Sequence, residues 1–188
     1  MSRIDLGGWI MAMNKTILKW WLIGYATGDS TLQNWGLKTS SANPMIAERL
    51  KMLLGDPWVR PPRGSNRKRL YVFKITDPDL IKLIMSMKQG RAPRRFGRVK
   101  MLGWIAGYLD ADGSVLFRDS NLYGEFFTID WRLVRLIVRV LEGLRKSWRI
   151  GLDYRYRGRL RKHPLFRIYS KDVDDIPSVK VMMAMDRY

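Results

Sequence analysis

Two segments of the sequence repeat each other and lie nearly half the chain apart. Residues 21–30 read WLIGYATGDS, and residues 104–113 read WIAGYLDADG. Tryptophan, glycine, tyrosine and aspartate coincide at a constant separation of 83 residues. In a chain of 188 residues, which has room for one domain or for two small halves, this repeat predicts two halves of the same fold sharing one core.

The same order of expected elements follows each copy of the repeat. In the first half, Asn43-Pro44 and Asp77-Pro78 each provide a helix cap followed by proline at the first helical position. The expected elements there are strands at 31–34 and 35–39, a helix at 44–54, strands at 58–63 and 70–76, and a helix at 78–87.

In the second half, Asp130 precedes a helix with one apolar face. Strands are expected around it at 115–118, 123–129, 148–157 and 165–171, and a last helix at 179–185. We therefore predict an α+β protein of two pseudo-symmetric αββαββα halves, residues 1–87 and 101–188, joined by a basic linker, residues 88–100.

Charge and composition restrict the partners of such a chain. Lysine and arginine number 35 against 17 acidic residues, a net charge of +18, which predicts a polyanionic partner. A hydrophobic share of 46% excludes a disordered polycation. Cysteine is absent and His163 is the single histidine, which excludes thiolate sites and argues against zinc. No uncharged apolar run is long enough to span a membrane, so no membrane partner is expected.

Basic residues concentrate in stretches without acids, and one stretch shows a strict alternation. Arg155, Arg157, Arg159 and Arg161 occupy every second position. In a strand these four side chains would share one face, where phosphates would relieve their mutual repulsion. Together with other basic and aromatic residues on expected strands or next to them, they form the predicted nucleic-acid-binding set: Trp35, Arg60, Arg63, Arg67, Arg69, Arg118, Arg155, Arg157, Arg159 and Arg161.

The repeated segment itself has two physical peculiarities. Gly24 and Gly28, like Gly107 and Ala111, are small residues four positions apart, which lets two helix backbones approach closely. Each expected helix also ends in an aspartate, which the helix dipole opposes. If the helices pack together, the two carboxylates need a proton or a cation between them, and a hard ion such as Mg²⁺ suits oxygen ligands.

Residues 105–113 resemble the nonamer that names the LAGLIDADG homing endonucleases, and residues 22–30 resemble its more degenerate first copy. The resemblance covers nearly the whole chain. It implies a monomer in which the motif helices form the central interface and two antiparallel sheets form a saddle on double-stranded DNA. It also implies that Asp29 and Asp112 are the catalytic carboxylates and the ligands of Mg²⁺ or Mn²⁺, with the backbone carbonyls of Gly28 and Ala111 as further ligands. The family cuts both DNA strands and leaves short 3′ overhangs.

The sequence departs from the motif at two positions of the first copy. Thr27 stands where the first aspartate is usual, and Ser30 replaces the final glycine, which affects the turn that aims Asp29. The basic and polar residues that organise water around the metal have no short motif in the family. Our candidates for that role lie on the expected strands: Lys74, Arg167, Gln33 and Lys38.

Two other functions remain open on the same scaffold. One is an RNA-splicing maturase that binds intron RNA, and the other is a DNA-binding regulator without catalysis. The resemblance favours a protein encoded in an intron, and the composition, with few amides and no cysteine, fits a heat-adapted source. Such a protein would be cytoplasmic in a prokaryote and organellar in a eukaryote.

Overall fold

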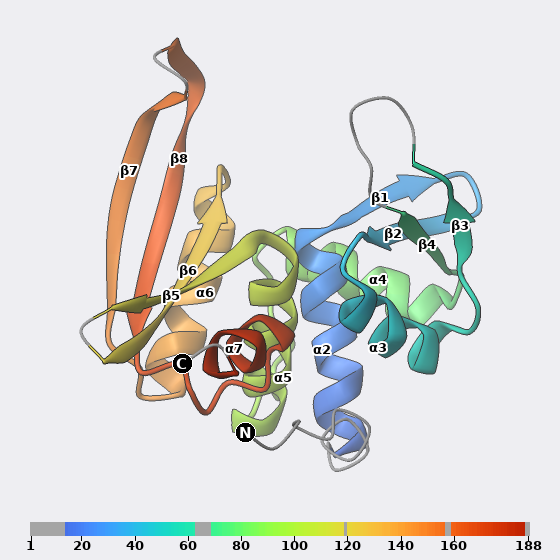
Figure 1. The fold of residues 1–188 in the computed structure, drawn as a ribbon, viewed down its shortest axis with the longest axis horizontal. Coiled ribbons are helices and arrows are strands. Elements are labelled where there is room, and N and C mark those ends of the chain that lie inside the picture. Colours follow the sequence, from blue (N-terminus) through green and yellow to red (C-terminus); the bar gives the residue numbers. More distant parts are fainter. Residues whose placement is uncertain (1–13, 63–68, 119, 157–158, 187–188) are drawn as a thin grey trace.

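The chain folds into two successive αββαββα units, as the repeat predicts (Figure 1). The structure, a computed structural model, describes residues 14–62, 69–118, 120–156 and 159–186. The first unit consists of α2 (Lys15–Gly28), β1 (Ser30–Gln33), β2 (Gly36–Ser41), α3 (Pro44–Leu54), β3 (Trp58–Arg60), β4 (Leu70–Ile75) and α4 (Pro78–Lys88). The second consists of α5 (Arg98–Asp112), β5 (Gly113–Arg118), β6 (Asn121–Thr128), α6 (Trp131–Gly143), β7 (Trp148–Tyr156), β8 (Arg159–Lys171) and α7 (Val179–Met185). The predicted α+β class is confirmed.

Helix starts follow from local capping chemistry. The side chains of Asn43, Asp77 and Asp130 accept hydrogen bonds from backbone N–H groups of the helices they precede, α3, α4 and α6. Pro44 and Pro78 occupy first helical positions, where a missing N–H costs nothing. The three caps predicted from sequence are therefore confirmed.

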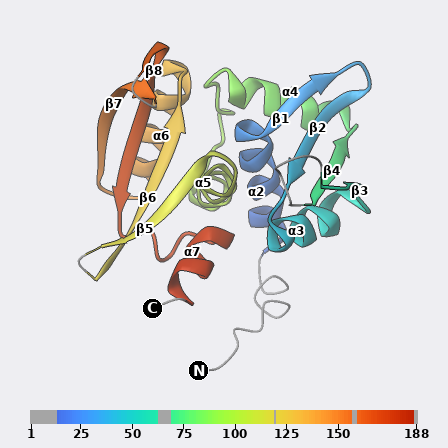
Figure 2. The same cartoon turned by 45° about the horizontal axis from the view of Figure 1, so that its top comes forward.

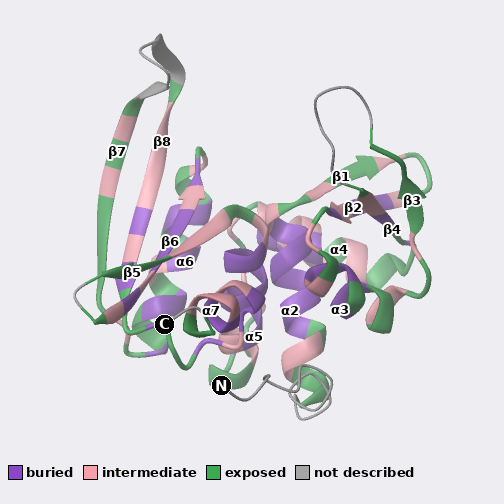
Figure 3. Ribbon diagram, in the orientation of Figure 1, coloured by how far each residue is buried: buried purple, intermediate pink, exposed green. Residues whose placement is uncertain are grey.

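Each unit contributes one antiparallel sheet of four strands. The strand orders are β1-β2-β4-β3 and β5-β6-β8-β7, so the two sheets have equivalent topologies. In both sheets apolar residues from one face pack against helices, among them Leu37, Phe73, Phe126 and Ile168. The buried residues form one cluster that includes both units, and much of it lies in α2 and α5 (Figure 3). None of the described helices has both the length and the apolar character of a membrane span.

The two motif helices, α2 and α5, pack directly on each other at the centre of the molecule (Figure 2). A Cβ atom added to Gly24 would overlap the carbonyl oxygen of Trp104, and one added to Gly107 would overlap that of Trp21. One turn further along, a Cβ on Gly28 would lie 2.8 Å from the Cβ of Ala111. The small residues thus allow the close backbone approach that their spacing predicted.

Replacing Gly107 by alanine is expected to destabilise the protein because the added methyl group must displace the backbone of α2. Overpacking of a tight contact typically costs about 1–3 kcal/mol, and this contact is with backbone that cannot rotate away. The melting temperature should therefore fall by several degrees in differential scanning calorimetry. Gly151→Ala is the matched control, since a Cβ at that position lies 3.5 Å from the nearest atom, an ordinary contact. Equal melting temperatures for the two variants would contradict the packing argument.

The predicted linker, residues 88–100, is shorter in the structure. Helix α4 includes Lys88 and α5 begins at Arg98, so the connection spans residues 89–97. Within it Phe96 is buried and its ring lies 5.0 Å from that of Trp20. The basic residues around Phe96 gave no sign of this core contact. The last three residues of the predicted linker are helical, since Gly97 is the N-cap of α5.

The predicted arginine row on one strand is wrong. Strand β7 ends at Tyr156 and β8 begins at Arg159, and the register pairs Arg155 with Leu160 and Tyr156 with Arg159. The chain therefore reverses direction in the middle of the row. The alternation spans two antiparallel strands, so it does not place the four positions along one strand. Position 157 and the side chains of Arg155, Arg159 and Arg161 lie outside the described residues.

Candidate active site at the ends of the two central helices

Asp29 and Asp112 lie at the same end of the packed helix pair. Asp29 is the residue that follows α2, and Asp112 is the last residue of α5. A Cβ atom on Gly28 would lie 3.1 Å from a carboxylate oxygen of Asp112, so the two helix ends are adjacent. Both aspartates are exposed to solvent. The close packing at the glycine positions thus brings together two carboxylates that are 83 residues apart in the sequence.

The turn after each aspartate is built differently in the two halves. Strand β1 begins at Ser30, whose hydroxyl donates to the carbonyl oxygen of Ala26 at 2.5 Å. Strand β5 begins at Gly113, where an added Cβ would lie 2.5 Å from Leu109 and 2.8 Å from a backbone oxygen of β6. Serine is therefore accommodated in the first copy through a helix-end hydrogen bond, and each aspartate still lies directly before a strand.

Burial and mutual repulsion disfavour the charged forms of the two acids. Although both side chains reach solvent, the surrounding protein atoms raise the pKa of Asp29 and of Asp112 by removing part of their hydration. The charge of Asp112 raises the pKa of Asp29 further. Lys88 acts in the opposite direction on both carboxyl groups and is the largest such influence on each. The site is thus a place where negative charge is crowded and only partly neutralised by the protein.

Two lysines that sequence reasoning missed complete this site. Lys88, the last residue of α4, donates to the carbonyl oxygen of Ser30 at 2.9 Å, and Lys180 of α7 donates to that of Gly113 at 2.6 Å. Each lysine therefore bonds the residue that follows one of the aspartates. Burial lowers the pKa of both lysines, while the neighbouring carboxylates raise it. Neither contact has a local sequence signal, because 58 and 67 residues separate the partners.

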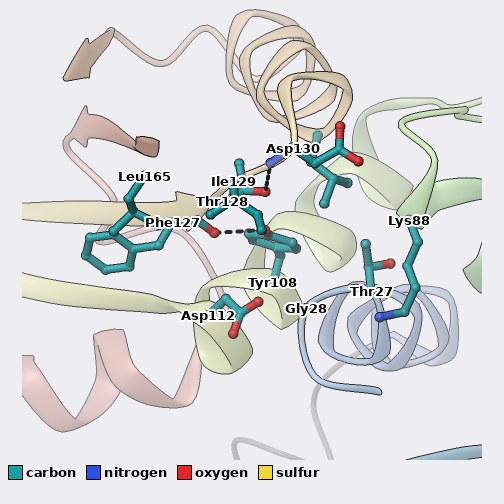
Figure 4. Close-up of a pocket in the computed structure, with 11 residues that line it drawn as sticks. Thr27, Gly28, Lys88, Tyr108, Asp112, Phe127, Thr128, Ile129, Asp130 and Leu165 are labelled. Carbon is teal, nitrogen blue, oxygen red and sulfur yellow. Dashed lines mark hydrogen bonds between the residues drawn. The ribbon is translucent and has the colours of Figure 1, made fainter. Parts of the chain in front are cut away.

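A cavity of about 620 Å³ opens beside the helix ends (Figure 4). Lys88, Asp112 and Phe127 are among its lining residues. Tyr108 lines it too and donates from its hydroxyl to the carbonyl oxygen of Phe127 at 3.0 Å, which ties α5 to β6. Space next to the carboxylate of Asp112 is therefore available to a group as large as a nucleotide.

The oxygen-rich donor set fits a hard divalent cation. Within the ranges that the structure describes, no three acidic or histidine side chains are grouped as a self-sufficient metal site. Mg²⁺ does not require such a cage, because it commonly binds one or two carboxylates and keeps waters and substrate phosphates as its other ligands. Asp29 and Asp112, with the helix-end carbonyls of Gly28 and Ala111, meet this requirement. The crowded charge described above is the physical reason for a cation there.

The four residues suggested for the water network differ in their surroundings. Lys38 and Lys74 pair across β2 and β4, and the charge of Lys38 lowers the pKa of Asp29 slightly. Lys74 also lies 5.2 Å from the ring of Trp35. Gln33 ends β1 and pairs with Gly36. Their role stays a prediction, and Lys38 is the one whose charge acts on Asp29.

Arg167 is held by other residues of its own sheet. Its guanidinium lies 3.4 Å from a carboxylate oxygen of Asp153 and 3.9 Å from one of Glu125. It also donates to the hydroxyl of Tyr169 at 3.3 Å and lies 5.5 Å from the ring of Phe127. These contacts fix the guanidinium beside Phe127, which lines the cavity.

The predicted DNA-binding residues that the structure describes are exposed. Trp35 lies between β1 and β2, Arg60 ends β3, and Arg118 ends β5. Arg60 stacks 4.9 Å from the ring of Trp58, and Arg69 directly precedes β4. Arg63 and Arg67 lie outside the described residues, as does Arg157. The described members are thus spread over both sheets.

Asp110, the first aspartate of the second motif, is buried between the halves and was not assigned from the sequence. It accepts hydrogen bonds from the indole of Trp21 at 2.8 Å, the hydroxyl of Ser178 at 2.6 Å and the backbone N–H groups of Val179 and Lys180. Arg49 of α3 lies 3.7 Å away, with both side chains fully buried. This carboxylate therefore joins α7 to helices of the first half.

Thr27 occupies the equivalent position in the first motif. Its hydroxyl accepts a hydrogen bond from the indole of Trp104 at 3.3 Å and donates to the carbonyl of Ile23. The tryptophan of each motif thus bonds the polar residue of the other motif. Because position 27 is threonine, the interface buries only the carboxylate of Asp110. With aspartate at both positions it would bury two carboxylates.

The raised pKa values predict that asparagine at both positions 29 and 112 stabilises the fold at neutral pH. A carboxyl group whose pKa is higher in the folded state contributes stability at low pH, which is lost as the pH rises through the raised pKa. Without divalent ions, the Asp29→Asn/Asp112→Asn variant should therefore melt higher than the parent at pH 7. The difference should vanish below about pH 4, the ordinary range of aspartate. Mg²⁺ should raise the melting temperature of the parent alone, and a variant that melts lower at pH 7 would contradict the prediction.

Comparison with models of protein families found no match, and neither did comparison with curated protein sequences. Solved structures do match. The N-terminal LAGLIDADG domain of DUF199/WhiA has a TM-score of 0.56 at 14% identity, over 95% of this chain and 89% of that chain. Variants of the homing endonuclease I-DmoI have a TM-score of 0.52 at 14% identity, over 87% of this chain and 88% of that chain. Two equivalent αββαββα units with a motif helix at the start of each, and this likeness over nearly the whole chain, show that the protein has the single-chain, two-motif LAGLIDADG fold.

Proposed function

We propose that this protein is a site-specific endonuclease that cuts double-stranded DNA with the help of a divalent metal ion. The observation that carries the proposal is the pair of solvent-exposed aspartates, Asp29 and Asp112, at adjacent ends of repeat-related helices. Burial raises the pKa of both carboxyl groups, and the charge of Asp112 raises that of Asp29 further, so a cation between them would stabilise their charged forms. The homing endonuclease I-DmoI, which shares the fold, has been solved in complex with DNA and manganese.

DNA would lie across the faces of the two sheets that helices do not cover. The net charge of +18 supplies long-range attraction to phosphates, and exposed basic side chains such as Arg60 and Arg118 supply contacts. Because the two sheets are related by the internal repeat, they would contact the DNA on both sides of the central aspartates. Two cuts, one in each strand, then fall near the middle of the bound site.

Asp29, Asp112 and the carbonyl oxygens of Gly28 and Ala111 would hold Mg²⁺ or Mn²⁺. Such an ion supplies an activated water and stabilises the leaving oxygen of the phosphodiester. Lys88 keeps a positive charge close to both carboxylates, where the scissile phosphate would bring additional negative charge. Lys180 fixes the carbonyl groups at the end of α5 and so orients Asp112.

Further properties belong to the same proposal. The protein would act as a monomer, encoded in an intron, and leave short 3′ overhangs. It would work in the cytoplasm of a prokaryote or in an organelle of a eukaryote.

Incubation with DNA that spans an insertion site lacking the intron tests the proposal. We expect cleavage of both strands there and nowhere else, only when Mg²⁺ or Mn²⁺ is present. The same DNA with the intron in place is the control and should stay intact because the site is interrupted. Tight, specific binding without cleavage under any metal condition would instead indicate a DNA-binding regulator.

A further inference from the structure

A second basic site lies between the turn after α4 and helix α6. This arginine cleft has a volume of about 430 Å³. Arg91 enters it from the turn, and Arg132, Arg135 and Arg139 enter it from α6. Leu136 is its one aliphatic lining residue. Four of its seven lining residues are arginines, which makes the cleft suited to an anion.

The arginine cleft lies away from the sheet faces proposed for the target DNA. Helix α6 packs apolar residues such as Ile137 and Val140 into the core beneath the sheet of β5 to β8 (Figure 1). Arg135 and Arg139 are exposed on the other side of the helix, about 10 Å further out, since a helix with its side chains is about 10–12 Å thick. Arg135 and Arg139 therefore lie on the side of α6 that faces away from the sheet, outside the face proposed for the duplex.

Local structure holds the wall of the cleft in place. The N–H of Arg91 donates to the carbonyl of Ser86 at 3.0 Å, and the hydroxyl of Ser86 donates back to the carbonyl of Arg91 at 3.0 Å. Gly90 has φ +73°, and a Cβ atom there would lie 2.5 Å from the carbonyl oxygen of Arg132. The turn therefore packs on the backbone of α6. This contact holds the backbone of Arg91 beside the arginines of the helix.

The charges of the cleft are largely uncompensated. Arg132 is paired with Asp130 at 2.7 Å. In the described part of the chain, no ion pair forms to Arg91, Arg135 or Arg139. Arginines three and four positions apart on a helix repel one another. Placing like charges next to one another on a helix is locally unfavourable, and such unfavourable choices are expected at functional sites.

The first half of the molecule shows that the fold does not require these arginines. Counted from its capping residue, α3 carries Met45, Glu48 and Met52 where α6 carries Arg132, Arg135 and Arg139. The cavity beside α3 has mixed charge, with Glu48, Lys51 and Asp56 among its lining residues. The three arginines of α6 thus have no counterparts on α3.

We propose that the arginine cleft binds single-stranded nucleic acid through its phosphates. A cavity of this volume matches small ligands and is too small for a duplex. Arginine binds phosphate oxygens with two parallel hydrogen bonds, and its planar group stacks on bases that have left a helix. A looped or extended strand offers both groups, while a duplex keeps its bases stacked. The cleft is a separate cavity that adjoins the one beside Asp112, since Gln89 and Arg132 line the cleft while Lys88 and Asp130 line the other cavity.

Fluorescence anisotropy in buffer without divalent ions tests the proposal with three probes of one sequence: a single-stranded RNA, the corresponding single-stranded DNA and the RNA paired into a duplex. We expect Arg135→Gln/Arg139→Gln to weaken binding of a single strand at least tenfold. The slope of log affinity against log salt should fall by about 1.4, since each phosphate contact in a single strand contributes about 0.7. A larger loss for RNA than for DNA would identify RNA as the ligand, and the reverse result would identify DNA.

The matched control is Lys15→Gln/Lys19→Gln, which removes two exposed charges, also four positions apart, from the start of α2, the opposite end of that helix from Asp29. This control should change single-strand binding less than about twofold. Equal losses for the two variants, stronger binding of the paired probe, or complete competition by inorganic phosphate at millimolar concentration would each overturn the proposal. Because the assay needs no cleavage, its outcome is separate from that of the endonuclease proposal. An unchanged melting temperature of Arg135→Gln/Arg139→Gln shows that the variant is folded.

Discussion

Replacing either Asp29 or Asp112 by asparagine is expected to abolish double-strand cleavage while DNA binding persists. Asparagine keeps the size of the side chain but removes the negative charge that attracts the metal ion. Losing one preorganised electrostatic contact at a reacting centre typically costs about a hundredfold to a thousandfold in rate. We expect at least that loss for each single variant and no detectable cutting for the double variant. Binding should be unchanged or tighter, because a negative charge facing phosphates is removed.

A plasmid carrying the target site separates the possible outcomes. Supercoiled, nicked and linear forms report how many strands are cut, so a variant that only nicks would show that one aspartate serves one strand. The control is Asp174→Asn, which should cut normally. It removes an exposed charge that is distant in the sequence from the ends of α2 and α5. Full cutting by the double variant would falsify the assignment of the catalytic pair.

Asp110→Asn is expected to be the most destabilising conservative substitution in this interface. The amide cannot accept all of the hydrogen bonds that the carboxylate receives from Trp21, Ser178 and the start of α7, since its own N–H₂ group faces donors. It also removes the negative charge that lies 3.7 Å from the buried guanidinium of Arg49. Breaking a buried pair from one side costs about 3–5 kcal/mol. For a chain of this size that corresponds to a fall of roughly 6–20 °C in melting temperature.

Thermal and chemical unfolding measure the effect of this substitution. The matched control is again Asp174→Asn, which changes the same chemical group at an exposed position and should lie within about 0.5 kcal/mol of the parent. A double variant, Arg49→Met/Asp110→Asn, should recover part of the lost stability, because it removes the buried positive charge together with the negative one. If Asp110→Asn unfolds like its control, the carboxylate does not join the halves as described.

Features with a local physical cause could be predicted from the sequence. The capping residues Asn43, Asp77 and Asp130 act on the next few N–H groups, so their helices start where the sequence indicates. The repeat predicted equivalent halves, and the glycine spacing predicted close packing of the motif helices. These determinants lie within four residues of one another, or recur at a constant separation that comparing the chain with itself reveals.

Features that depend on tertiary packing could not be predicted in the same way. Lys88 and Asp110 owe their roles to partners 58 to 89 residues away, and no rule of spacing connects them. Phe96 was concealed by the basic residues around it. The arginine row is a different case, because Gly158 in the middle of the row was an available turn signal. The alternation of arginines favoured one continuous strand, whereas Gly158 indicated the turn that the structure has between β7 and β8.

The unequal pair Asp110 and Thr27 makes the two halves complementary partners that cannot replace each other. A dimer of two second halves would bury two carboxylates in its centre without Arg49, and a dimer of two first halves would bury that guanidinium without a carboxylate. Either assembly would leave charge stranded in the core. Because the second motif has Asp110 where the first has Thr27, each half packs stably only on the other half. The two sheets can therefore differ in sequence, and the DNA site proposed for this protein need not be symmetric.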